Sequence, residues 1–238
     1  MTEIIGYCLL TMVVFLGWFT IQQKSRWVLL NPVLMSLLTL ISLFLLLDIS
    51  YAQYMQGAQY INYLLEPAVV LLGYPLYKQL KLLRSQWRKI FFICFMASIT
   101  SLTVSGVLAR VMGLEDWLIA SVVTLNVTTA IAMSTSAEIG GSGAITANIV
   151  FIGGMTGSIL GVLWLRLIGV INKEHQQPTT LENKIVGLAI GSSAHAIGTA
   201  SIVKEFPVGA AYSSTALILC AIITAVIAPV YIPLLLQW

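Results

Sequence analysis

The residues best suited to chemistry lie in one hydrophobic stretch, residues 187–200. A plain lipid-facing helix needs neither the ionisable group nor the hydroxyls and glycines found there. Because glycine permits a helix to break and hydroxyls can bind the backbone groups that a break exposes, the stretch predicts a broken helix lining a cavity at membrane depth. We place the candidate site on its small and polar residues, Gly187, Gly191, Ser192, Ser193, His195, Gly198 and Thr199.

His195 is one of two histidines in the chain and is the first candidate for proton coupling. An imidazole titrates near physiological pH, so a proton gradient could load it from one side, and ionisable residues at membrane depth are usually tied to a pathway. The alternative is a neutral histidine that is hydrogen-bonded to a facing helix. Glu66 and Glu138 are rival carriers of charge, and Glu66 is the second coupling candidate.

The composition indicates an integral membrane protein. Apolar residues make up 58% of the 238 residues and charged residues only 9%, which is outside the range of soluble globular domains. At about 20 residues per span, the length accommodates roughly seven or eight spans and leaves no water-soluble domain. We therefore predict an all-α polytopic membrane protein, with residues 1–238 as one transmembrane domain of about seven spans plus a re-entrant or broken segment.

The charges and cysteines argue against several other classes of protein. The net charge is +3, and the basic residues cluster at loop positions, where they set orientation and do not form a nucleic-acid surface. Cys8, Cys94 and Cys220 each lie within an apolar run, which is typical of packing residues. We expect no metal site, no cofactor and no nucleic-acid partner.

The first half of the chain predicts simple spans at 4–21, 28–47 and 90–109, with a tyrosine-rich outer interfacial segment at 48–62. The intervening span, 63–79, cannot be one straight helix, because breaking residues interrupt it. A dense basic cluster follows it and marks the cytoplasmic side. The breaking residues are Pro67, Gly73 and Pro75, and the basic residues are Lys78, Lys81, Arg84, Arg88 and Lys89.

The region 117–143 must differ from a plain span. Two simple spans between residues 117 and 170 would put the basic loop that follows them outside, against the positive-inside rule. The many hydroxyl residues and glycines of the region, Gly140 and Gly141 among them, predict a re-entrant segment or a pair of half-helices. The remaining spans are expected at 144–168 inward, 184–204 outward and 210–236 inward, which leaves the carboxyl terminus in the cytoplasm.

Two broken helices of opposite direction, 63–79 and 187–200, suggest an inverted repeat with halves 28–110 and 144–238. Secondary transporters share this pattern, and their substrates bind at the midplane where the broken helices meet. Hydroxyls and backbone amides there can bind a carboxylate without a buried lysine. The alternative is that they only satisfy the broken backbone. We expect substrate contacts from Thr128, Thr129, Ser192, Ser193, His195, Gly198 and Thr199, with Asn126 and Asn148 as further candidates. Helix breaks are expected at Pro67, Gly73, Pro75, Gly140, Gly141 and Gly191. Ser213 and Ser214 are expected to be packing residues.

Several stretches in order along nearly the whole chain resemble the LrgB/CidB family. They are Leu64-Leu-Glu-Pro-Ala-Val-Val-Leu-Leu-Gly-Tyr-Pro-Leu-Tyr-Lys-Gln79, Val127-Thr-Thr-Ala-Ile-Ala-Met133, Gly140-Gly141, His195-Ala-Ile-Gly-Thr-Ala200, Gly209-Ala-Ala-Tyr-Ser-Ser214 and Thr224-Ala-Val-Ile-Ala-Pro229. Two features depart from the family pattern. The segment Thr124-Leu-Asn-Val-Thr-Thr-Ala130 lacks a lysine and two prolines that family members commonly have there, and Glu66 stands where a small residue is usual.

The resemblance implies one of two functions. One is antiholin-like regulation of murein hydrolase export and autolysis. The other is transport of small monocarboxylates such as pyruvate, glycolate or glycerate, usually beside a small LrgA/CidA-type membrane protein. We expect a proton-coupled transporter that forms homo-oligomers in the bacterial plasma membrane. An intramembrane enzyme is not expected, because no nucleophile elbow or metal motif accompanies Ser192, Ser193 and His195.

Overall fold

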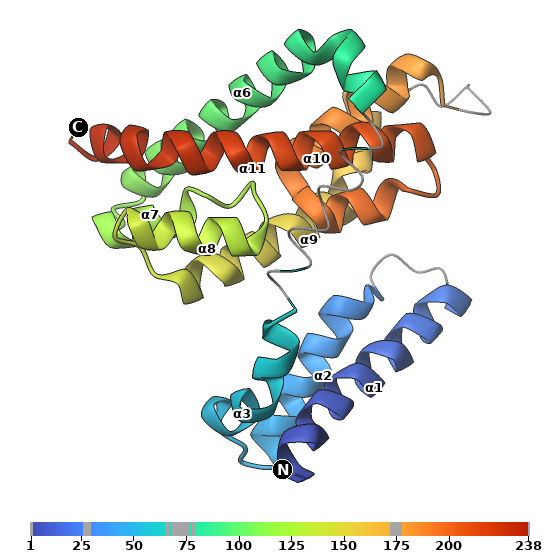
Figure 1. Cartoon of the computed structure of the whole chain (residues 1–238), viewed down its shortest axis with the longest axis vertical. Coiled ribbons are helices and arrows are strands. Elements are labelled where there is room, and N and C mark those ends of the chain that lie inside the picture. The colour runs from blue at the N-terminus through green and yellow to red at the C-terminus, as the bar shows by residue number, and fades with distance from the viewer. Residues whose placement is uncertain are drawn as a thin grey trace. The chain divides into compact units, whose positions relative to one another are not determined.

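The computed structural model describes residues 2–25, 30–64, 67, 77, 80–171 and 178–237. Within these ranges the only regular secondary structure is helical (Figure 1). The helices are α1 (Thr2–Ser25), α2 (Pro32–Leu46), α3 (Tyr51–Asn62), α6 (Leu80–Val111), α7 (Asp116–Val122), α8 (Thr129–Glu138), α9 (Gly143–Leu167), α10 (Thr180–Ile202) and α11 (Pro207–Leu236). Five of them, α1, α6, α9, α10 and α11, are long and apolar enough to cross a membrane, and α2 is a shorter apolar helix. The prediction of an all-helical polytopic membrane protein is confirmed.

The broken third span expected at 63–79 falls largely outside the described residues. Glu66, Gly73 and Pro75 are among the residues that are not described, and Pro67 is described as an exposed residue with helical backbone. The discontinuity of this segment, and with it the inverted repeat of 28–110 and 144–238, therefore stays a prediction.

The chain divides into two compact units, Met1–Val70 and Leu71–Trp238. In the first unit, α1 packs against α2 and α3 through polar bonds within an apolar setting. The indole Nε1 of Trp18 donates to Thr39 Oγ1 at 2.9 Å, and the Thr11 and Tyr54 hydroxyls lie 3.1 Å apart. The stretch expected as an outer interfacial segment forms α3, because Ser50 and Gln53 complete a capping box at its start.

In the second unit, α6 and α11 run parallel. Contacts between them advance in the same direction along both helices: Cys220 Sγ lies 3.7 Å from the Cys94 carbonyl oxygen, and the Thr103 and Tyr231 hydroxyls lie 2.7 Å apart. Arg110 then donates from Nη1 to the Leu236 carbonyl oxygen at 2.9 Å. Both helices therefore begin at one end of the unit and finish at the other, as Figure 1 shows.

Helix α10 is a helical hairpin. His195 has the backbone angles φ 41° and ψ −135°, which no helix accommodates. In a straight helix Ile190 and Gly198 would be about 12 Å apart along the axis. Instead, a Cβ built on Gly198 would lie 3.5 Å from the Ile190 carbonyl oxygen, so residues 196–202 fold back against 180–194. The orange ribbon of α10 in Figure 1 shows this reversal before the chain enters α11.

The reversal confirms a helix break within 187–200 but corrects its direction. The sequence predicts that 184–204 crosses outward, with Lys204 and Glu205 on the far side. In the structure Glu205 pairs with Arg166 at the end of α9, and the Asn183 side chain accepts a hydrogen bond from Gly209 N at 2.9 Å. The two ends of α10 thus lie at the same end of the unit, because positive φ at His195 turns the chain around.

Helices α7 and α8 form a second hairpin, which confirms the predicted half-helices in 117–143. Thr124 Oγ1, in the turn that follows α7, donates to the Ala132 carbonyl oxygen of α8 at 3.4 Å. Gly140, with φ 85°, ends α8 in a Schellman motif, and Gly141 N donates to the Ser136 carbonyl oxygen at 2.8 Å. A Cβ on Gly141 would clash with the backbone of α7, so both glycines are required where the sequence predicts a break.

Candidate functional site

The tips of the two hairpins meet the same part of α9, shortly before the middle of that 25-residue helix. At the tip of α10, His195 Nε2 lies 3.2 Å from the Val150 carbonyl oxygen. At the tip between α7 and α8, Leu125 is next to Gly153, where a Cβ would lie 3.4 Å from its Cδ1. The hairpins enter from opposite ends of the unit, since α7 begins beside the end of α11 and α10 begins beside its start. This meeting point is our candidate site.

His195 is held tightly at the candidate site. Only 3% of its surface is exposed, and the imidazole packs against Gly154, where a Cβ would lie 2.5 Å from Cε1. Because the Val150 carbonyl can only accept, Nε2 of His195 carries the proton in this hydrogen bond. A non-glycine residue at positive φ is a strained conformation, and such strain is concentrated at functional and switch positions.

The hydroxyls near His195 are bonded within the protein. Thr199 Oγ1 donates to the His195 carbonyl oxygen at 2.7 Å and accepts from Ser213 Oγ of α11 at the same distance. Ser192 and Ser193 both donate to the Ala189 carbonyl oxygen, at 3.2 and 2.7 Å. These bonds agree with the alternative interpretation of the sequence, in which the hydroxyls bind backbone groups near the helix break. Contact between a substrate and the remaining lone pairs of these hydroxyls stays a prediction.

The glycines of α10 permit close packing. Gly191 lies against the backbone of Ser213, and Gly198 lies against Ala194 and Ile190 of the other arm. On the facing helix, a Cβ at Gly157 or Gly161 would clash with α10 side chains. The predicted break thus lies at His195, four residues after Gly191, and Gly191 serves the contact with α11.

The tip between α7 and α8 carries polar groups without partners. Asn126 is 2% exposed, and neither its Nδ2 nor its Oδ1 has a hydrogen-bond partner among the described residues. The same holds for Thr128 Oγ1, although Thr128 is the N-cap of α8 and its hydroxyl would ordinarily cap that helix. Partly buried Thr129 opens α8. The helix therefore presents its partial positive charge at the tip.

Other candidates from the sequence lie away from this point. Glu138 is exposed at the end of α8, and exposed Asn148 donates to the Ala144 carbonyl oxygen of its own helix at 2.8 Å. Glu66 and His175 lie outside the described residues. The sequence offers Asn126 only as a further candidate, since a sequence does not reveal that a buried amide lacks partners. Its position in an apolar run just before two threonines is the available signal.

The arrangement favours binding a small anion. The two tips, residues 123–128 and 190–199, contain no lysine or arginine. A helix N-terminus with its free amides, a hydroxyl and an amide can stabilise a carboxylate without a buried cation. His195 adds a group that can exchange a proton about halfway along α9.

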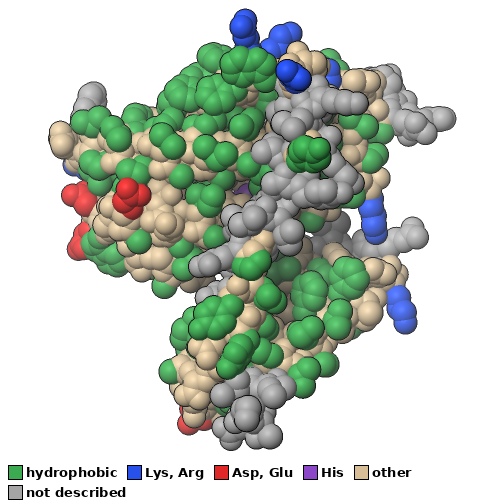
Figure 2. Space-filling model, viewed as in Figure 1, with side chains coloured by type: hydrophobic (Ala, Val, Ile, Leu, Met, Phe, Trp, Pro, Cys, Tyr) green, Lys and Arg blue, Asp and Glu red, His purple; other side chains and the backbone are tan. Residues whose placement is uncertain are grey.

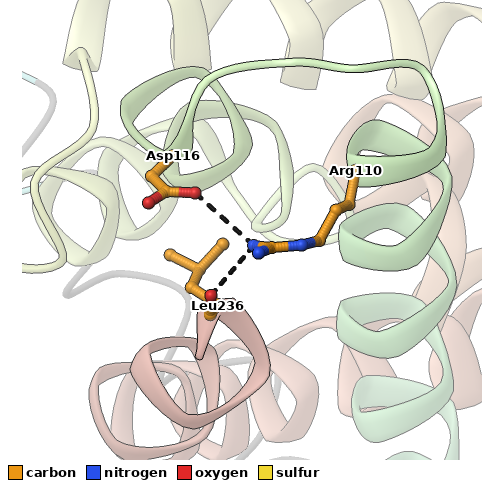
Figure 3. A network of polar contacts seen from close by, with 3 residues as sticks. All are labelled: Arg110, Asp116 and Leu236. Carbon is orange, nitrogen blue, oxygen red and sulfur yellow. Dashed lines mark hydrogen bonds and ion pairs between the residues drawn. The ribbon is translucent and has the colours of Figure 1, made fainter. Parts of the chain in front are cut away.

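The two ends of the second unit differ in charge. Basic residues lie where α6, α10 and α11 begin and α9 ends, namely Arg84, Arg88, Lys89, Arg166, Lys184 and Lys204. At the opposite end Arg110 bridges Asp116 and the Leu236 carbonyl oxygen, with Glu115 nearby in the chain (Figure 3). Figure 2 shows blue side chains near the start of α6 and red ones near α7.

Five long apolar helices together with two opposed helical hairpins define a polytopic membrane protein. The chain belongs to the LrgB-like family, whose sequence profile matches residues 11–234, and the resemblance noted in the sequence is confirmed. No solved structure matches the chain.

The chain is similar over nearly its full length to several bacterial proteins. An uncharacterized protein of Haemophilus influenzae is 35% identical over 96% of both chains. The holin-like protein CidB of Staphylococcus epidermidis is 33% identical over 94% of this chain and 93% of its own. The antiholin-like protein LrgB of Bacillus subtilis is 31% identical over 92% and 91%. These last two names describe one relative as holin-like and the other as antiholin-like.

Proposed function

We propose that this protein is a secondary transporter of small monocarboxylates of the pyruvate and glycolate type. The observation that carries the proposal is the pair Asn126 and Thr128 at the N-terminus of α8, whose buried polar atoms have no hydrogen-bond partner among the described residues. Their hairpin tip meets the same part of α9 as the broken helix at His195. Buried polar groups are normally hydrogen-bonded, so buried polar atoms without a partner among the described residues support a ligand-binding role for this tip. Broken helices whose ends point at an anionic substrate are typical of secondary transporters.

His195 couples transport to protons in this proposal. Its imidazole is buried between α9 and α10, and its backbone is strained. A second proton on the ring would therefore alter the hydrogen bond to Val150 and the relative stability of the strained turn. Glu66 remains the second coupling candidate from the sequence. A homo-oligomer and a small LrgA/CidA-type partner are parts of the same proposal.

The charge distribution supports one orientation in the bacterial plasma membrane. The basic end of the second unit faces the cytoplasm under the positive-inside rule. Since α11 begins at that end and runs parallel to α6, its carboxyl end faces outward. The cytoplasmic position of the basic end agrees with the sequence prediction, but the direction of α11 and the side of the carboxyl terminus are opposite to those expected, because α10 returns at His195 and does not cross.

Uptake of labelled pyruvate, glycolate and lactate into proteoliposomes under an imposed pH gradient tests the proposal, with the chain alone and with an LrgA-like partner. Saturable uptake that collapses with the gradient is expected. His195→Ala should abolish gradient-driven accumulation, while Asn148→Ala, on an exposed part of α9, should leave it unchanged. Equal uptake by wild type and His195→Ala removes His195 from the mechanism.

A second candidate function is antiholin-like control of autolysis, which the names of two relatives favour. It predicts permeability that depends on oligomerisation, without a small-molecule site. Leakage of unrelated solutes from the proteoliposomes, with no saturable uptake in either reconstitution, would replace the transport proposal with this one.

A further inference from the structure

The amide of Asn126 is the most unusual polar group in the described part of the chain. It is almost fully buried, and both its donor and its acceptor atom lack partners. Leaving such a group unpaired is costly, whereas an apolar side chain of the same size would cost nothing. A tip that only had to pack would therefore carry leucine here.

The groups around Asn126 define what a ligand must offer. Thr128 Oγ1, two residues later, is also unpartnered, and the first amides of the 10-residue helix α8 follow directly. Amides and a hydroxyl donate, so they suit the carboxylate of the substrate. Asn126 Oδ1 differs from them because it can only accept.

We propose that Asn126 selects 2-hydroxy carboxylates over 2-oxo carboxylates. This inference rests on the proposed function and names the substrate class of that site. The Thr128 hydroxyl and the α8 amides bind the carboxylate, and Asn126 faces the 2-position. A 2-hydroxyl donates to Oδ1 and accepts from Nδ2, so it satisfies both atoms. A 2-oxo group only accepts, so Oδ1 stays buried without a donor.

The size of the preference follows from the cost of that unpaired oxygen. A site that hydrogen-bonds a substrate hydroxyl discriminates strongly against an analogue that cannot pair with it. Lactate and pyruvate share a carbon skeleton and a charge and differ only at the 2-position. We expect half-saturation for lactate at a concentration about tenfold below that for pyruvate.

The test compares lactate and pyruvate uptake by the full-length protein in proteoliposomes. Asn126→Leu should bring the two half-saturation values to within about threefold of each other, because neither atom of the amide remains. The matched control is Asn148→Leu, the same change at an exposed residue of α9, which should keep the wild-type ratio. Thermal unfolding in detergent checks folding, and Asn126→Leu should unfold at the wild-type temperature or above.

Thr128→Val is a second variant, which tests the proposal even if the Asn126→Leu protein does not fold. It should raise the half-saturation values for lactate and pyruvate by the same factor, since the carboxylate is common to both. Wild-type transport with equal values for the two acids, or a ratio unchanged in Asn126→Leu, overturns the inference and leaves the transporter standing. No saturable uptake of any acid by wild type overturns both.

Discussion

The two hairpins place their hydrogen bonds in opposite positions. In α10 the tip is bonded to itself and to α11, through Thr199 and Ser213. In the hairpin of α7 and α8 the bonds lie below the tip, between the two arms and α9, where Thr146 Oγ1 of α9 lies 2.7 Å from Ser136 Oγ and 2.8 Å from the Ser121 carbonyl oxygen. At the tip of that hairpin, the side chains of Asn126 and Thr128 find no hydrogen-bond partner within the described part of the chain.

This difference indicates a division of roles between the hairpins. A tip whose polar groups are satisfied keeps a strained turn in one geometry, and α10 therefore fixes the position of His195. A hairpin whose arms are bonded to α9, but whose tip holds polar groups without partners among the described residues, is held firmly while its end remains available to a ligand. Substitutions at matched pairs of residues test this division of roles.

The largest effect is expected from Gly154→Ala. The new Cβ would lie 2.5 Å from His195 Cε1 and 2.8 Å from Nε2, so the imidazole must leave its place against α9. Uptake should fall at least about tenfold, with a cost of about 1–3 kcal/mol for the overpacked contact. The measurement is initial uptake rate per folded protein.

Gly153→Ala is the matched control for that change. Its Cβ would meet Leu125 of the other hairpin at 3.4 Å, which is an ordinary contact, so near-normal uptake is expected. Equal losses of uptake rate in Gly154→Ala and Gly153→Ala would contradict the special role given to the position of His195 against α9.

A smaller effect is expected from Thr199→Val, which removes the link between Ser213 and the His195 carbonyl. Loss of these hydrogen bonds should lower the free energy of unfolding by about 1–2 kcal/mol. Thermal or denaturant unfolding in detergent measures it. Ser193→Ala, which removes an exposed hydroxyl bonded to its own helix, should change stability by less than about 0.5 kcal/mol. A larger loss from Ser193→Ala than from Thr199→Val would contradict the role given to Thr199.

The smallest effect is expected from Arg110→Gln, far from both tips. Arg110 and Asp116 are separated by 3.5 Å and remain substantially exposed, so water screens their attraction. Stability should change by less than about 0.5 kcal/mol, and uptake should be unaltered. A large loss of uptake would extend the functional region to the end of the unit drawn in Figure 3.

Much of the fold could be predicted from the types of residues. Apolar runs predict the long helices, and the glycines and hydroxyls in 117–143 and 187–200 predict that these two segments are not plain spans. Gly140 illustrates why this works, since positive φ after a helix is a conformation that glycine adopts easily.

The geometry of the turn at His195 could not be predicted in the same way. Positive φ is usually reached by glycine, and Gly191 and Gly198 flank the position, yet the turn occurs at a histidine held by tertiary contacts. The candidate role of Asn126 had a similar obstacle. Whether a buried amide is bonded depends on residues that are distant in the chain, and that information appears only once the helices are packed.

The reversal of α10 has a practical effect on experiments that map topology with fused reporters. Its 23 residues are apolar enough for hydropathy counting to assign one passage. A hairpin that enters and leaves at one end contributes none. The number of membrane passages before α11 is therefore one fewer than hydropathy counting gives. A phosphatase or fluorescent tag fused to the carboxyl end of α11 should report the side of the membrane opposite to the one that such counting assigns.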